Sequence, residues 1–138
     1  MIFLKSHGEV DRMAKACQTD RKDWAGRKTT ALLIWGVPQA AFLLGCFVSP
    51  LFRTFLWTAS LTVAGAACLV NAYRCGRMHC YFTGPFFLFG AVATLLFGLG
   101  TLPLGPHGWV WIGATAVAGG CILSFLPERL WGKYSSRC

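Results

Sequence analysis

Acidic residues are scarce in this chain of 138 residues. Only 5 Asp and Glu residues stand against 13 Lys and Arg residues, and none lies between Asp23 and Glu128. Charged residues make up 13% of the chain and hydrophobic residues 55%, whereas soluble domains carry about 25% charged residues. This composition excludes a soluble enzyme, a disordered chain and a disulfide-rich secreted mini-protein, and it indicates a membrane protein.

Several functional motifs are missing as well. The apolar segments contain no Asp or Glu, which disfavours transport coupled to protons or sodium through a buried carboxylate. This separates the chain from small multidrug exporters, which it resembles only in size and number of spans and whose first-span glutamate it lacks. No Gly-rich phosphate loop, catalytic triad or carboxylate pair is visible, so we expect no enzyme. We also expect no nucleic-acid partner, because the basic residues flank apolar blocks.

Long apolar runs are the main positive feature of the sequence. A membrane-spanning helix needs about 20 apolar residues, because the hydrocarbon core of a bilayer is about 30 Å thick. Four stretches meet this need, at about residues 30–48, 52–73, 85–104 and 109–126. We place Pro85 in the first turn of the third helix and expect the fourth to stop at Pro127. The predicted fold class is an all-α integral membrane protein, a four-transmembrane-helix bundle with a short amphipathic N-terminal interfacial helix.

The basic residues predict the domain layout and the orientation. Residues 1–29 form a basic N-terminal segment, 30–126 the transmembrane domain and 127–138 a tail. All Lys and Arg except Arg53 fall on the side of the two ends and of the connection between the second and third spans. The positive-inside rule then places both ends in the cytoplasm of a multi-pass protein of the cell (inner) membrane. The bilayer is the expected partner, and basic residues beside the apolar stretches are predicted to bind lipid head groups: Arg27, Lys28, Arg74 and Arg77.

The N-terminal segment carries a helix signal of its own. Ser6 followed by Glu9 matches a capping box, and apolar residues then fall on one helical face: Val10, Met13, Cys17 and Trp24. This pattern predicts a short interfacial helix on the inner leaflet. A frayed tail with a chance pattern is the alternative.

Two thiols and an imidazole lie close together between the second and third spans. Cys75, His79 and Cys80 fall within six residues, with Gly76 favouring a turn in which all three converge. Soft cations such as Hg(II), Cu(I) and Zn(II) prefer thiolate and imidazole ligands. The segment therefore predicts a cytoplasmic soft-metal site, and the sequence predicts no other cofactor.

Two further cysteines extend this hypothesis. Cys68 and Cys121 are each predicted in the inner half of a span, where they could act as relay thiols that pass the metal to the cytoplasm. Three alternatives stay open. The cysteines are small packing residues, or the chain is a non-catalytic subunit or scaffold of a larger membrane complex, or Cys75 and Cys80 form a redox pair. Small residues at four-residue spacing favour close helix packing, either within one chain or in a homo-oligomer.

In small size, four spans and membrane-embedded cysteines, the chain resembles the small membrane proteins of bacterial mercury resistance that pass Hg(II) to the cytoplasm. The resemblance is one of architecture. Those proteins carry a closely spaced cysteine pair in the first span, where this chain has only Cys46. It therefore implies a kind of function and assigns no role to any residue.

Overall fold

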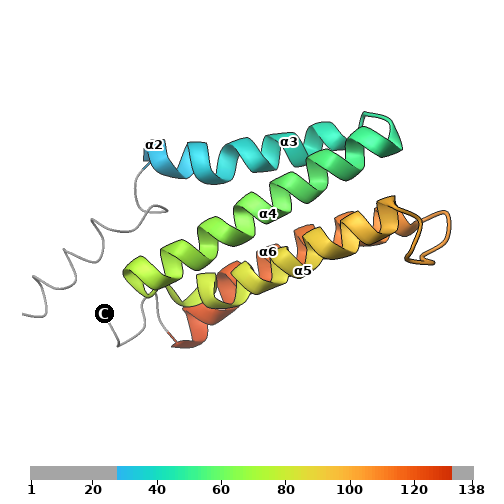
Figure 1. Ribbon diagram of the computed structural model, residues 1–138. Helices are drawn as coiled ribbons and strands as arrows, with labels where there is room; N and C mark the ends of the chain where they lie inside the picture. Colours follow the sequence, from blue (N-terminus) through green and yellow to red (C-terminus); the bar gives the residue numbers. More distant parts are fainter. Residues whose placement is uncertain (1–27, 132–138) are drawn as a thin grey trace, which may run out of the picture.

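The protein is built from helices joined by short connections. The computed structural model describes residues 28–131 (Figure 1). In chain order the elements are α2 (Lys28–Ala31), the π-helical turn η1 (Leu32–Gly36), α3 (Val37–Gly45), α4 (Pro50–Cys75), α5 (Met78–Gly98) and α6 (Gly108–Trp131). The interfacial helix predicted between Ser6 and Trp24 lies outside the described residues.

The first three elements form one continuous helix of 18 residues, Lys28–Gly45. Its π-helical turn has a local cause, because Pro38 has no N–H to offer the carbonyl four residues earlier. The N–H of Val37 instead bonds to the carbonyl of Leu32, five residues back. At 1.5 Å per residue the helix is about 27 Å long, close to the hydrocarbon thickness of about 30 Å.

Three helices are long and apolar enough to cross a membrane: Pro50–Cys75, Met78–Gly98 and Gly108–Pro127. These three helices indicate that the chain is a small multi-pass membrane protein. Long apolar helices are thus confirmed for the last three predicted stretches, while the first corresponds to the shorter helix that ends at Gly45.

Two predicted helix boundaries are wrong, both at prolines. Helix α5 begins at Met78, so Pro85 lies inside it, and α6 continues past Pro127. A proline removes a single backbone hydrogen bond, and long apolar helices accommodate that loss. The earlier start of α5 shortens the predicted connection to Gly76 and Arg77, with Gly76 at φ 65° ending α4 in the left-handed conformation.

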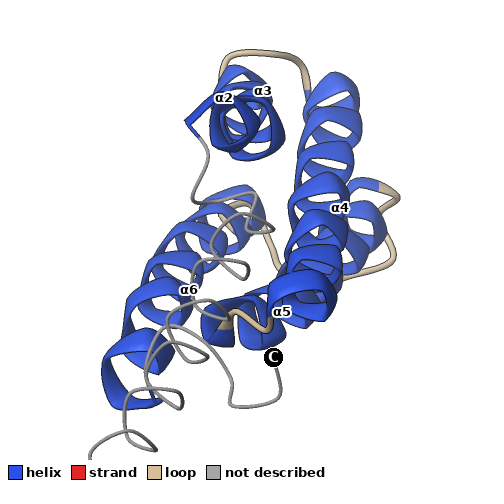
Figure 2. Ribbon diagram, turned by 90° about the vertical axis from the view of Figure 1, so that its left-hand side faces the viewer, coloured by secondary structure: helices blue, strands red, loops and turns tan. Residues whose placement is uncertain are grey.

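The helices pack in chain order. The backbones of α3 and α4, of α4 and α5, and of α5 and α6 lie close together, whereas α6 meets α4 through side chains, such as Trp109 against Trp57. In Figure 2, α3 and α6 lie on the same side of the molecule, and their backbones are not in contact. The α4–α5 contact is close, because a Cβ at Gly65 would lie 2.9 Å from the carbonyl oxygen of Gly84.

The turn between α3 and α4 is held by two side chains of α4. Arg53 donates hydrogen bonds to three carbonyls at the end of α3 and in the turn, at 2.9, 3.0 and 3.3 Å. Its guanidinium group also lies over the ring of Trp109, 5.5 Å from the centroid. Trp57 stacks on Phe42 and donates from Nε1 to the Phe42 carbonyl at 2.8 Å. Arg53 and Trp57 thus stabilise the turn between α3 and α4.

Candidate thiol site

Two buried thiols meet where α4 packs against the first turn of α5. Cys68 is 1% exposed and Cys80 is 0% exposed, and the two side chains pack in one buried cluster. Ala72 completes this small buried cluster, and Trp35 of η1 packs against it. The short connection at Gly76 positions the pair, since it turns α5 back along α4 directly after Cys75.

Polar groups surround Cys80 on two sides. The Asn71 amide, itself 0% exposed, donates from Nδ2 to Cys80 Sγ at 3.7 Å. His79 Nε2 lies 3.3 Å from the same sulfur, and the Thr83 hydroxyl donates to the His79 carbonyl at 2.5 Å. Cys80 also lies at the N-terminus of α5, where the helix dipole favours negative charge. The sulfur of Cys80 therefore has an imidazole, an amide and a second thiol as neighbours.

Cys75 lies at the end of α4. It is buried, and its Sγ donates to the carbonyl of Asn71 at 2.9 Å. Because Gly76 ends α4 and Met78 starts α5, only Gly76 and Arg77 separate the two helices in this segment. Cys80 has His79 beside its sulfur and packs in the buried cluster with Cys68.

A lateral cleft leads to this cluster. Its volume is about 470 Å³, and Cys68 and His79 are among its lining residues. Cys121 of α6 lines the same cleft and is exposed, and it belongs to no buried thiol cluster within the described residues. The two predicted relay thiols are therefore placed differently, one in the thiol pair and one along the cleft.

The predicted lipid-binding residues gather near the same end of the bundle. Arg74 and Lys28 are exposed, and Arg77 is half-buried in the connection between α4 and α5. Arg27 lies outside the described residues. The thiol pair is thus the buried neighbour of a basic surface.

Within residues 28–131, no group of three or more His, Cys, Asp and Glu side chains is arranged to hold a metal ion. None of the five cysteines described there is joined in a disulfide. The available donor set is consequently a pair of thiols with one imidazole beside it.

Asn71 and Trp35 are two neighbours of the thiol pair that the sequence did not single out as site residues. The spacing of residues along α4 could have identified Asn71. Cys68, Asn71 and Cys75 follow one another at i, i+3 and i+7, which places them on one face of α4. That face packs against the start of α5.

Comparison of the chain with protein families, curated proteins and solved structures finds no match. The function is therefore argued from the site alone.

Proposed function

We propose that the protein binds a soft metal cation, Hg(II) or Cu(I), through the thiolates of Cys68 and Cys80. The packing of two buried thiols from different helices in one cluster supports this proposal. Soft cations select thiolate ligands, and both ions accept linear coordination by two of them. Each thiol loses its proton when the metal–sulfur bond forms, so binding releases two protons.

His79 is the third donor in this proposal. Its Nε2 lies 3.3 Å from Cys80 Sγ, and in this proposal the imidazole turns toward a metal held between the sulfurs, because the three side chains are not already arranged around a metal position. Structural Zn(II) sites use four ligands, and for that reason we assign the pair to Hg(II) or Cu(I). A redox pair of Cys75 and Cys80 has less support, because the thiol in contact with Cys80 is Cys68. We assign no enzymatic reaction.

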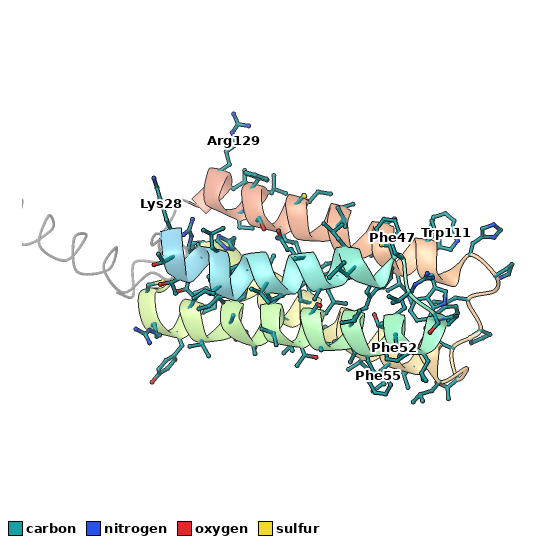
Figure 3. All side chains as sticks on the ribbon, turned by 90° about the horizontal axis from the view of Figure 1, so that it is seen from above. Lys28, Phe47, Phe52, Phe55, Trp111 and Arg129 are labelled. Carbon is teal, nitrogen blue, oxygen red and sulfur yellow. The ribbon has the colours of Figure 1, made fainter. Side chains whose placement is uncertain are left out.

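The proposed orientation places the thiol pair near the cytoplasm. Lys28 and Arg129 lie at the same end of the bundle (Figure 3), and the connection with Arg77 follows the end of α4. Arg53 is at the other end, where it bonds to backbone carbonyls. Under the positive-inside rule, the end with several basic residues faces the cytoplasm. We propose that the helix Lys28–Gly45 is a fourth span.

Passage of the metal would follow the lateral cleft. Cys121 and Cys68 both line it, and His79 lies at the thiol pair. A soft ion can move by exchange between thiolates, since each exchange replaces one metal–sulfur bond by another. In this proposal Cys121 is a relay residue and the Cys68–Cys80 pair is the binding site.

The test counts bound metal. We would purify the reduced protein in detergent and titrate Hg(II), Cu(I) and Zn(II) separately, measuring metal per chain after removal of the excess. The change is Cys68→Ser together with Cys80→Ser. We expect one tightly bound Hg(II) or Cu(I) per chain to be lost in this variant.

The matched control is Cys75→Ser, which removes another buried thiol of α4. It should keep the tightly bound ion, because Cys75 is not in the proposed pair. Unchanged binding in the double variant, or equal loss in the control, would contradict the assigned site.

A second candidate function is a non-catalytic subunit or scaffold of a larger membrane complex. The observation in its favour is that only 17% of the apolar window of α6 is buried within the chain. A partner helix would cover more of this surface. The scaffold function predicts that another protein co-purifies in mild detergent, and a single homogeneous species would count against it.

A further inference from the structure

The cleft between α3 and α6 is shaped differently from the rest of the bundle. Its walls come from all the long helices, and because the backbones of α3 and α6 are not in contact, the cleft opens sideways between these two helices. Much of the lining is aromatic or aliphatic, including Trp35, Phe42, Phe87, Val117 and Phe125. Water is absent from the hydrocarbon core of a bilayer. An apolar cleft that opens sideways at that depth is therefore suited to a hydrocarbon chain.

The extent of the cleft matches one leaflet. Along α3 its lining runs from Trp35 to Leu43, which is about 12 Å at 1.5 Å per residue. Along α6 it runs from Ala116 to Phe125, about 14 Å by the same rise. Half of a hydrocarbon core of about 30 Å is about 15 Å. The length of the cleft is thus close to the length that one acyl chain spans in a single leaflet.

Positive charge lies at one end of this cleft, on both helices that border it. Lys28 begins the helix containing α3, and Arg129 lies in the last turn of α6. Both side chains are exposed, and Figure 3 shows them at the same end of the bundle, projecting toward the same side. Glu128 is the only acidic residue within residues 28–131.

We propose that the cleft binds an anionic phospholipid, with one acyl chain between α3 and α6 and the phosphate group between Lys28 and Arg129. Basic pockets between membrane helices bind such head groups, and the apolar walls accept the chain. The cleft volume of about 470 Å³ suits one chain and not a whole lipid. This inference does not need the Cys68–Cys80 metal site, but Cys68 and Cys121 line the same cleft, so a bound acyl chain would have to leave before a metal ion could pass.

The experiment compares two lipids with the same acyl chains. We would titrate delipidated protein with phosphatidylglycerol and with phosphatidylcholine and count bound lipid by native mass spectrometry. The wild-type chain should retain one phosphatidylglycerol in preference to phosphatidylcholine. Lys28→Gln with Arg129→Gln should reduce that preference about 30-fold, the combined effect of two surface charges. Arg74→Gln, which removes an exposed charge of the same end, is the matched control and should have a smaller effect.

A second pair of variants tests the acyl chain. Val117→Trp fills the cleft from its α6 wall, whereas Val92→Trp adds the same bulk at an exposed position of α5 that does not line it. Val117→Trp should weaken binding of both lipids, and Val92→Trp should weaken neither. Equal effects within either pair of variants would overturn the proposal. So would a wild-type dimer that Val117→Trp dissociates, since a second copy would then occupy the cleft.

A labelling measurement covers the case in which Val117→Trp fails to fold. Phosphatidylglycerol with a diazirine in mid-chain should, on irradiation of the wild-type protein, label peptides of α3 and α6 that line the cleft. Labelling confined to other faces would overturn the proposal.

Discussion

Replacement of Gly65 by alanine tests the close contact on which the thiol pair depends. A Cβ at this position would lie 2.9 Å from the Gly84 carbonyl oxygen and 2.9 Å from Leu88 Cγ. A leucine side chain can rotate away, but the backbone oxygen cannot, so α4 and α5 must separate slightly. Overpacking of this kind costs about 1–3 kcal/mol.

Gly90→Ala is the matched control, because it makes the same chemical change on α5. A Cβ there would lie 3.5 Å from Leu61 Cδ1, an ordinary van der Waals contact. Both variants gain the helix propensity of alanine, about 1 kcal/mol, so their difference isolates the overpacking. We expect Gly65→Ala to be less stable than Gly90→Ala by about 1–3 kcal/mol.

The assay is reversible unfolding in mixed micelles with increasing sodium dodecyl sulfate, followed by helical circular dichroism. Because Cys68 follows Gly65 by one helical turn, Gly65→Ala should also weaken Hg(II) binding, and Gly90→Ala should leave it unchanged. Equal unfolding free energies for the two variants would refute the close approach. Equal metal affinities would refute its link to the thiol pair.

Three further predictions concern side chains with defined hydrogen bonds, and the same unfolding assay measures each of them. Arg53→Gln loses charged hydrogen bonds to the turn after α3 and should lower the unfolding free energy by about 1.5–3 kcal/mol; no change would contradict this anchoring. Trp57→Phe keeps the stack on Phe42 but loses the hydrogen bond from Nε1. We therefore expect it to lower the unfolding free energy by only about 0.5–1.5 kcal/mol. A larger decrease than for Arg53→Gln would contradict that ranking. Asn71→Leu removes the amide that donates to Cys80 Sγ and should change Hg(II) affinity as well as stability, whereas unchanged affinity would separate the amide from the site.

The sequence predicted the membrane architecture well because hydrophobic length is a direct physical requirement of a bilayer. The stretches at about 52–73, 85–104 and 109–126 all correspond to long apolar helices. Boundaries at prolines could not be read in the same way. Pro85 is compatible with a first turn and with a helix interior, and only packing against α4 decides between them.

The thiol site was predicted only in part, because Cys68 lies far from His79 and Cys80 in the sequence and meets them only in the folded chain. His79 and Cys80 are neighbours in sequence, so their proximity needed no fold. Cys68 reaches Cys80 because a short connection folds α5 back onto α4, and that register depends on where α4 ends. The sequence suggested a wide turn at Gly76, whereas the helices continue almost to that residue from both sides. The thiol of Cys75 donates a hydrogen bond to the Asn71 carbonyl of its own helix, α4.

The most direct test of the central claim is the sulfur coordination of bound Hg(II), measured by X-ray absorption spectroscopy on the loaded protein. If Cys68 and Cys80 bind the metal, we expect two sulfur ligands in the wild-type chain and in Cys75→Ser, and loss of that coordination in both Cys68→Ser and Cys80→Ser. Two sulfur ligands that persist without Cys68 and Cys80, or that disappear in Cys75→Ser, would contradict it.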